Sequence, residues 1–260
     1  MSPEIRVLAS SQEVFELAAE EFVRQTNDAV SKRGRFTVAL SGGSTPKALY
    51  QLLVERYAAK LPWAQIFFFW GDERHVPPDH ADSNYRMAKE ALLSKVPVPT
   101  EKVFRIPTEE KDAVRAAASY EQTLRKFFKL KPGEFPRFDL ILLGMGPDGH
   151  TASLFPHTDA LQEKTRLVVA NWIEKFQAYR LTLTLPVINN SACVMFLVTG
   201  SDKAAALREV LASDSPADQF PAKLVQPLNG KVIWAVDRTA AASLPPNINT
   251  TYRANQEQVK

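Results

Sequence analysis

Short apolar segments alternate with segments of helical periodicity along most of the chain, and this alternation limits the folds it can adopt. The runs that predict strands are Thr37–Leu40, Ile66–Trp70, Leu140–Leu143, Leu167–Ala170, Leu181–Leu185, Val194–Val198 and Val232–Val236. Between them, apolar residues recur at helical spacing at Val14, Leu17, Ala18 and Phe22, at Leu49, Leu52 and Leu53, and at Ala204, Leu207 and Leu211. The sequence therefore predicts an α/β protein with three layers, α/β/α, around a mostly parallel central sheet.

Two of the predicted strands carry more detail. The run Phe67–Trp70 is apolar at every position, which is typical of a central strand covered by helices on both faces. The run Leu181–Leu185 alternates leucine with threonine, which predicts a half-exposed edge or antiparallel strand. No repeat, low-complexity tract or long linker interrupts the 260 residues, so we expect a single domain over residues 1–260.

Composition excludes several classes of protein. The net charge of +3 comes from 32 basic and 29 acidic residues without a long run of one sign, so nothing indicates nucleic-acid binding. No window approaches the roughly 18 apolar residues of a membrane span, and the first residues lack a signal-peptide pattern. The only cysteine, Cys193, lies in an apolar run and predicts a buried thiol. We expect a cytoplasmic protein, with a monomer as the default.

The first segment with chemical content follows the predicted strand Thr37–Leu40 and leads into a helix with Pro46 in its first turn. Ser44 or Thr45 is the expected N-cap. Glycines let backbone amides approach an anion, and a helix N-terminus supplies free N–H groups, so phosphate is the natural ligand. The candidate phosphate-binding residues are Ser41, Gly42, Gly43, Ser44 and Thr45. A capped turn without a ligand is equally compatible with this stretch alone.

The second segment, Gly71-Asp-Glu-Arg, places several charges directly after the strand Ile66–Trp70, where open α/β sheets bind their ligands. Arg74 is a candidate phosphate clamp, and Asp72 and Glu73 could orient Arg74 or a substrate hydroxyl. The alternative is a solvated loop with surface ion pairs. Farther along, Asp82 is the expected cap of a helix, and further candidate site residues are Asn84 and Arg86.

The third segment, Gly144-Met-Gly-Pro-Asp-Gly-His, formally contains the dinucleotide-binding pattern Gly-x-Gly-x-x-Gly. Asp148 would repel a pyrophosphate at that position, and Leu167–Ala170 lacks the expected acidic residue, so this match is weak. A histidine at the tip of a strand suits general-base catalysis. We therefore predict His150 as the base and Asp148 as the group that holds its imidazole.

Two further cationic residues are candidate phosphate ligands, and the sequence lacks the patterns of a metal site and of a serine nucleophile. Arg180 and Lys203 could each reach a phosphate, and each could equally be a surface charge. The four histidines show no metal-ligand spacing, so no metal site is expected. No Gly-x-Ser-x-Gly elbow is present, which disfavours a serine nucleophile and favours water activated by His150.

Together these segments resemble the glucosamine-6-phosphate isomerase/6-phosphogluconolactonase family, in order along nearly the whole chain. The matching stretches are Ser41–Pro46, Trp70–Arg74, Gly144–Pro156 and Arg180–Asn189. The resemblance is to the lactonases of this family, and it implies a sugar-phosphate isomerase/deaminase-like fold. It also implies hydrolysis of 6-phosphogluconolactone in the oxidative pentose phosphate pathway, without a metal or organic cofactor.

On that resemblance, the phosphate would dock on residues 41–45, helped by Arg74 and by Arg180 or Lys203. The oxyanion would be stabilised by a nearby cation or by backbone N–H groups of the Gly144–Gly149 loop, including Gly146. Related glucosamine-6-phosphate deaminases typically carry a glutamate five residues after the histidine, where this chain has Phe155. A non-catalytic sugar-phosphate sensor and a dinucleotide-binding protein are the remaining alternatives.

Overall fold

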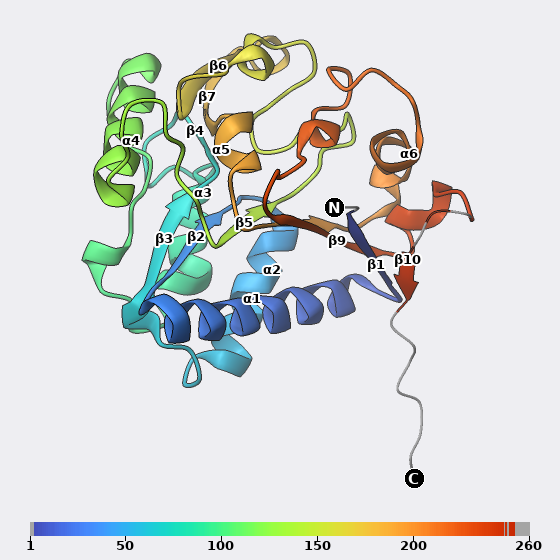
Figure 1. Ribbon diagram of the computed structural model, residues 1–260, viewed down its shortest axis with the longest axis horizontal. Coiled ribbons are helices and arrows are strands. Elements are labelled where there is room, and N and C mark those ends of the chain that lie inside the picture. The colour runs from blue at the N-terminus through green and yellow to red at the C-terminus, as the bar shows by residue number, and fades with distance from the viewer. Residues whose placement is uncertain (1–2, 247, 249, 253–260) are drawn as a thin grey trace.

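The computed structural model describes residues 3–246, 248 and 250–252, and two sheets organise this part of the chain (Figure 1). The larger sheet has seven strands, all parallel, in the order β10-β1-β9-β8-β5-β2-β3. Its strands are β1 (Glu4–Leu8), β2 (Phe36–Leu40), β3 (Ile66–Trp70), β5 (Leu140–Leu143), β8 (Cys193–Val198), β9 (Lys231–Asp237) and β10 (Thr250–Tyr252). The smaller sheet is antiparallel, in the order β4 (Asp72–Arg74), β7 (Ala178–Leu183), β6 (Val168–Ile173).

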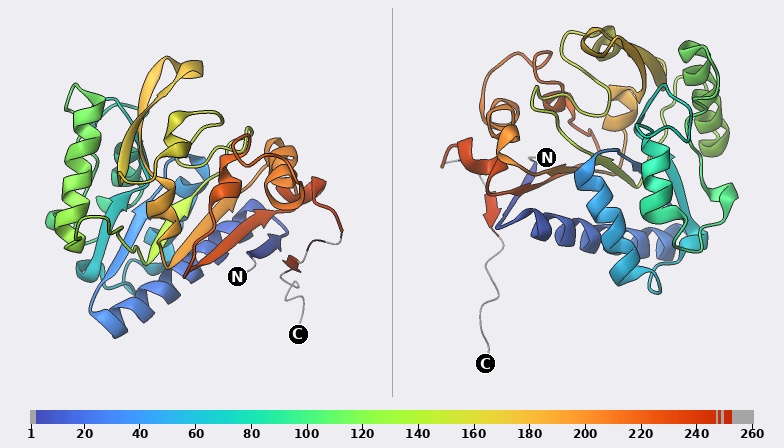
Figure 2. Two further views of the ribbon diagram at one scale, coloured as in Figure 1. Left: turned by 45° about the horizontal axis from the view of Figure 1, so that its top comes forward. Right: turned by 180° about the vertical axis from the view of Figure 1, so that it is seen from behind.

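Helices cover the large sheet. The longer ones are α1 (Ser11–Arg33), α2 (Ser44–Tyr57), α4 (Ala113–Phe128) and α6 (Ala204–Ala212), and the shorter ones are α3 (Asn84–Ala88) and α5 (Leu185–Asn189). Helices α1 and α2 lie together on one side of the sheet, and the small sheet, α5 and α6 lie on the other (Figure 2). Helix α4 packs against β6 and β7. Within the described ranges, no helix combines the length and apolar character needed to cross a membrane.

Local sequence explains where the longest helix begins and ends. Ser10 accepts a hydrogen bond from the amide of Glu13 at 3.3 Å, and the Glu13 carboxylate accepts one from the amide of Ala9 at 3.2 Å. The first bond satisfies one amide that the first turn leaves without a partner, and the second ties the residue before the N-cap to the helix. At the other end Gly34 adopts φ +70°, a left-handed conformation that ends the helix at little steric cost.

The predicted three-layer α/β/α architecture with its parallel central sheet is confirmed. The predicted strands near 167–170 and 181–185 exist, but as β6 and β7 they belong to the small sheet. The alternating pattern of the latter correctly indicated antiparallel pairing, because β7 runs antiparallel to both of its neighbours. The half exposure predicted for 181–185 is wrong, because all five residues are buried, and β7 is the middle strand of its sheet. The pattern missed β1, β4 and β10. Cys193 is buried as predicted, and burial raises the pKa of its thiol to about 11.

The prediction of a central position for Phe67–Trp70 is wrong, because β3 forms the edge of the large sheet. Its apolar side chains pack into an aromatic cluster. The Phe69 ring stacks on Phe104 at 4.8 Å between centroids and meets Phe127 at 5.0 Å and Phe138 at 5.3 Å. The amide of Phe104 also donates to the Phe68 carbonyl at 2.8 Å. The chain itself therefore covers an edge that could pair with another molecule.

This cluster should contribute strongly to stability. We expect Phe69→Ala to lower the free energy of unfolding by about 3–5 kcal/mol, because the ring is fully buried and its loss leaves a cavity. Urea denaturation measures the change. Leu228→Ala is the control, since that side chain is 87% exposed and should change stability by less than about 0.5 kcal/mol. Equal effects of the two substitutions would contradict this account of the edge.

Candidate active site

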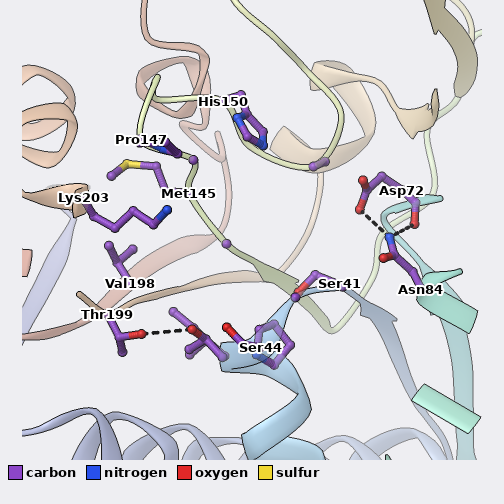
Figure 3. A pocket seen from close by; sticks show the side chains of 18 of the residues that line it. Ser41, Ser44, Asp72, Asn84, Met145, Pro147, His150, Val198, Thr199 and Lys203 are labelled. Carbon is purple, nitrogen blue, oxygen red and sulfur yellow. Dashed lines mark hydrogen bonds between the residues drawn. The ribbon is translucent and has the colours of Figure 1, made fainter. Parts of the chain in front are cut away.

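The carboxyl ends of β2, β5 and β8 open into one cavity of about 270 Å³ (Figure 3). This is slightly below the roughly 300–1,000 Å³ of typical small-molecule sites. Its lining comes from the loops that follow these strands and from the β3–α3 region: Ser41, Gly42, Gly43, Ser44, Thr45, Pro46, Asp72, Arg74, Asn84, Gly144, Met145, Gly146, Pro147, His150, Ala152, Leu197, Val198, Thr199 and Lys203. Parallel pairing brings the ends of these strands to the same edge of the sheet.

One wall of the cavity has the features of an anion site. Helix α2 begins at Ser44 with Gly43 as its N-cap, so the prediction of Ser44 or Thr45 at that position is wrong. Gly43 has φ +103°, which favours glycine, and no side chain caps the helix. The first amides of α2 are therefore not engaged by a capping side chain. Lys203, which begins α6 as its N-cap, lines the same cavity.

Two loops meet beside this helix end. The Thr45 hydroxyl lies 3.0 Å from the Thr199 hydroxyl, which joins the loop after β2 to the loop after β8 (Figure 3). Sequence reasoning missed Thr199, although its place at the end of the predicted strand Val194–Val198 was a usable signal. Met145 and Pro147, which form part of the wall, were missed as well, although they closely follow the predicted strand Leu140–Leu143.

Ser41 lies deeper in the cavity, with only 4% of its surface exposed. Its backbone is fixed by the Tyr50 hydroxyl, which accepts from the Ser41 amide at 3.1 Å and donates to the Ser41 carbonyl at 2.8 Å. The Ser41 Oγ atom is buried and has no hydrogen-bond partner among the described residues. A buried hydroxyl without a partner is costly, which makes Ser41 well suited to contact a ligand.

The opposite wall is acidic and polar. Asp72 is buried, and its Oδ2 accepts from the Ser153 hydroxyl at 2.7 Å. Asn84 donates to the Asp72 carbonyl at 3.0 Å (Figure 3). A Cβ atom at Gly42 would lie 1.8 Å from Asn84 Oδ1, so only glycine fits there. Asp72 and Asn84 thus face the cavity in fixed positions, across from Lys203.

Glu73 does not orient a guanidinium, contrary to one of the two predicted roles. Its carboxylate accepts from the amides of Arg74, Asn84 and Tyr85 at 2.7–2.8 Å. It also accepts from the hydroxyl of Ser83, which caps α3 by accepting from the Arg86 amide. Burial raises the pKa of the Glu73 carboxyl, although the three amides favour its charged form. Glu73 holds the turn that carries Asn84.

The other helix-start predictions in this region need correction. Ser83 is the N-cap of α3, whereas Asp82 was predicted, because the Ser83 hydroxyl is the acceptor for the first turn. Arg86 pairs with Glu90 at 2.7 Å and donates to the Asp79 carbonyl. It is absent from the cavity lining in the described part of the chain. Asn84 reaches the site, and Arg86 does not.

The two arginines of the small sheet are neighbours. Arg74 on β4 and Arg180 on β7 are directly paired across the strands. Arg74 lines the cavity and donates to the Asp82 carbonyl at 2.7 Å. Arg180 lies against the Phe176 ring and does not line the cavity of the described residues. Burial, reinforced by the charge of Arg74, lowers the pKa of Arg180. Of the three predicted phosphate cations, the cavity contains Arg74 and Lys203.

The loop after β5 carries the His150–Asp148 pair. The Nδ1 atom of His150 lies 2.5 Å from Asp148 Oδ1, and Oδ2 of Asp148 accepts from Lys175 at 3.2 Å. Burial opposes the charged form of Asp148, but its contacts with His150 and Lys175 outweigh this and hold the pKa of the carboxyl well below its usual range. Asp148 is thus a carboxylate at neutral pH, and the predicted contact with the imidazole exists.

Glycine 146 is required by this pair. A Cβ atom at Gly146 would lie 2.1 Å from His150 Nδ1 and 2.6 Å from Asp148 Oδ1. The Gly146 amide donates to the His150 carbonyl, and the Gly149 amide donates to the Gly146 carbonyl. The loop therefore closes on itself. Two of the amides that were predicted to hold an oxyanion are already used within it.

The same loop excludes the dinucleotide-binding interpretation. That motif needs a helix directly after the third glycine, whose N-terminus holds the pyrophosphate. After Gly149 the chain instead forms turns and an isolated bridge between Thr151 and Leu154.

Within the described ranges, no group of three or more histidine, cysteine, aspartate or glutamate residues could hold a metal ion.

Phe155 lies flat on the imidazole. Its ring stacks on His150 with 4.1 Å between centroids and 19° between planes. This is the position at which a glutamate is expected in a deaminase of the same family. An apolar ring here fixes the imidazole by packing and offers no second acid or base to a substrate.

Comparisons with known proteins identify the family of this chain. Residues 9–234 match the family model of glucosamine-6-phosphate isomerases/6-phosphogluconolactonase. A 6-phosphogluconolactonase from Synechocystis is 45% identical over 246 residues, which cover 95% of this chain and all of that protein. The solved 6-phosphogluconolactonase from Trypanosoma cruzi superposes with a TM-score of 0.85 at 34% identity, covering 94% of this chain and 98% of the other.

A solved monomeric glucosamine-6-phosphate deaminase has a TM-score of 0.77 at 21% identity, covering 92% and 99% of the two chains, and supports the fold alone. The sequence match and the structural match each extend over most of the chain. The chain belongs to the glucosamine-6-phosphate isomerase/6-phosphogluconolactonase family.

Proposed function

We propose that this protein hydrolyses 6-phospho-D-glucono-1,5-lactone to 6-phosphogluconate, the lactone-opening step of the oxidative pentose phosphate pathway. Curated relatives named 6-phosphogluconolactonase, one from rice with the qualifier "probable", are 36–45% identical over most of the chain. The observation that carries the proposal is the His150–Asp148 pair beside a cavity with an anion site. Phe155 disfavours the deaminase alternative, because no carboxylate is available at that position.

The two walls of the cavity suggest how the substrate lies. The phosphate would bind at the start of α2, where Lys203 supplies a positive charge and Ser44 and Thr45 supply amides. The sugar hydroxyls would then face Asp72 and Asn84 on the opposite wall. In this orientation the lactone ring would lie between the two walls, in the cavity that His150 also lines. Holding the reacting atoms in place accounts for part of the rate.

The chemistry needs one base and one water. Because Nδ1 of His150 faces Asp148, Nε2 is the nitrogen that can remove a proton from water. The hydroxide adds to the carbonyl carbon C1, and the tetrahedral intermediate collapses with cleavage of the bond from C1 to the ring oxygen. The imidazolium returns its proton to that oxygen. Asp148 stabilises the imidazolium in between.

The oxyanion of the intermediate needs a positive partner. Since the amides of Gly146 and Gly149 are engaged within their own loop, we assign this role to a cation in the cavity. Lys203 is committed to the phosphate in this arrangement. Arg74, on the wall that carries Asp72, is the remaining cation of the lining and is our candidate.

We expect His150→Ala to lower kcat by about 10²–10⁴-fold, the usual contribution of a general base. The measurement is a coupled assay that generates the lactone in situ and compares its decay with spontaneous hydrolysis. His80→Ala is the control, because that histidine is exposed and does not line the cavity. Full activity of His150→Ala would rule out its role as the base. A wild-type protein that binds sugar phosphates without turnover would indicate the sensor.

The two cations should affect different kinetic constants. We expect Lys203→Met to raise KM about 10- to 100-fold, because a hydrogen bond to a charged group contributes about 1.5–3 kcal/mol in both ground and transition states. Arg74→Met should mainly lower kcat, because its partner charge forms only during the reaction. Lys89→Met, at an exposed site outside the cavity, is the control. An unchanged KM in Lys203→Met would remove Lys203 from the phosphate site.

A further inference from the structure

A second cavity, of about 650 Å³, lies behind the His150–Asp148 pair. His150 lines the first cavity, whereas Asp148, Phe155 and Lys175 line the second. The pair is therefore part of the partition between the two cavities. The proposed substrate occupies only the first, so Lys175, which contacts the pair from the second, has no assigned role.

Lys175 is the charged residue that contacts the pair from this side. It lies at the tip of the β6–β7 hairpin, within the short turn Glu174–Phe176. Its Nζ atom lies 3.2 Å from Asp148 Oδ2, and it also lies over the Phe176 ring at 5.1 Å. Phe176 in turn meets the edge of Phe155, which stacks on His150. The hairpin tip thus contacts both the acid and the ring that packs on the base.

The two oxygens of Asp148 have different partners. Oδ1 accepts from Nδ1 of His150 at 2.5 Å and from the His150 amide at 3.3 Å. Oδ2 accepts from Lys175. Without the lysine, one oxygen would lose its charged partner, and the carboxylate could rotate about its Cβ–Cγ bond. The imidazole would then lose part of the geometry on which proton transfer depends.

We infer that Lys175 is a positioning residue of the active site, which holds the Asp148 carboxylate in the orientation that aligns His150. This inference rests on the proposed lactonase function and extends it to the β6–β7 hairpin. A contribution to stability does not explain the contact, because the Lys175 side chain is 57% exposed and surface ion pairs contribute little. The effect of Lys175 is therefore on the geometry and charge of the pair.

Other charged side chains surround the pair without this contact. On the substrate side, the first cavity is lined by Asp72, Arg74 and Lys203. Behind the pair, the second cavity is lined by His157, Asp159, Arg166 and Glu174. Arg166 is paired with Glu163, and Glu174 accepts from the Trp172 indole. Among the described residues, Lys175 is the lysine or arginine that contacts the Asp148 carboxylate.

The test compares Lys175→Met, which keeps the apolar stem, with Lys175→Arg, which keeps the charge. We expect Lys175→Met to lower kcat about tenfold. The figure is by analogy with groups that orient a metal-bound histidine from behind, whose loss typically costs about 10–100-fold in activity. KM should change little, because Lys175 does not line the substrate cavity. The acid limb of the kcat/KM–pH profile should move to higher pH. Without the positive charge of Lys175, the His150–Asp148 pair stays protonated up to a higher pH. Lys175→Arg should restore both.

Lys164→Met is the matched control, an exposed lysine in the loop before β6 that should behave as wild type. In an Asp148→Asn background, Lys175→Met should have no further effect, since the lysine acts through that carboxylate. Thermal unfolding of each variant checks that it is folded.

An active wild type with Lys175→Met indistinguishable from Lys164→Met would overturn this inference alone. So would a loss that Lys175→Arg does not restore and that leaves the pH profile unchanged, or effects that add in the Asp148→Asn background. A wild type without lactonase activity would overturn the proposed function and this inference with it.

Discussion

Parallel pairing of β2, β5 and β8 is the constraint on which the site depends. Neighbouring parallel strands carry their carboxyl ends to the same edge of the sheet, so three loops distant in sequence meet there. The loop after β2 contributes a helix N-terminus, the loop after β5 the His150–Asp148 pair, and the loop after β8 Thr199 and Lys203. None of these loops forms a site alone.

Glycines let the loops approach closely at two points. Gly42 leaves room for Asn84, and Gly146 leaves room for His150 and Asp148, in each case where a Cβ atom would overlap the neighbour. The acidic groups near the cavity are held by neighbours within the fold: Ser153 and Asn84 contact Asp72, and backbone amides contact Glu73. Preorganised groups of this kind lose little entropy when a substrate binds.

The small antiparallel sheet contributes to the cavity and to the surroundings of His150. It carries Arg74 on β4 and places the tip of the β6–β7 hairpin behind His150, where Phe176 and Lys175 contact Phe155 and Asp148. An aromatic ring on the imidazole and a cation on the carboxylate leave one acid–base pair for the substrate. The proposed function, addition of water to a lactone, requires only this pair.

The sequence by itself determined the layered α/β architecture, because apolar periodicity depends only on which faces of a strand or helix are buried. It also predicted the contact between Asp148 and His150 and most of the loops that line the cavity, because glycine, hydroxyl and charged residues directly after predicted strands lie at one edge of a parallel sheet. Only the tertiary structure decided which cations reach the cavity, that Glu73 accepts from backbone amides at the start of α3, and that β3 is an edge strand. Strand order and side-chain direction depend on contacts between residues far apart in the chain, which local patterns do not contain.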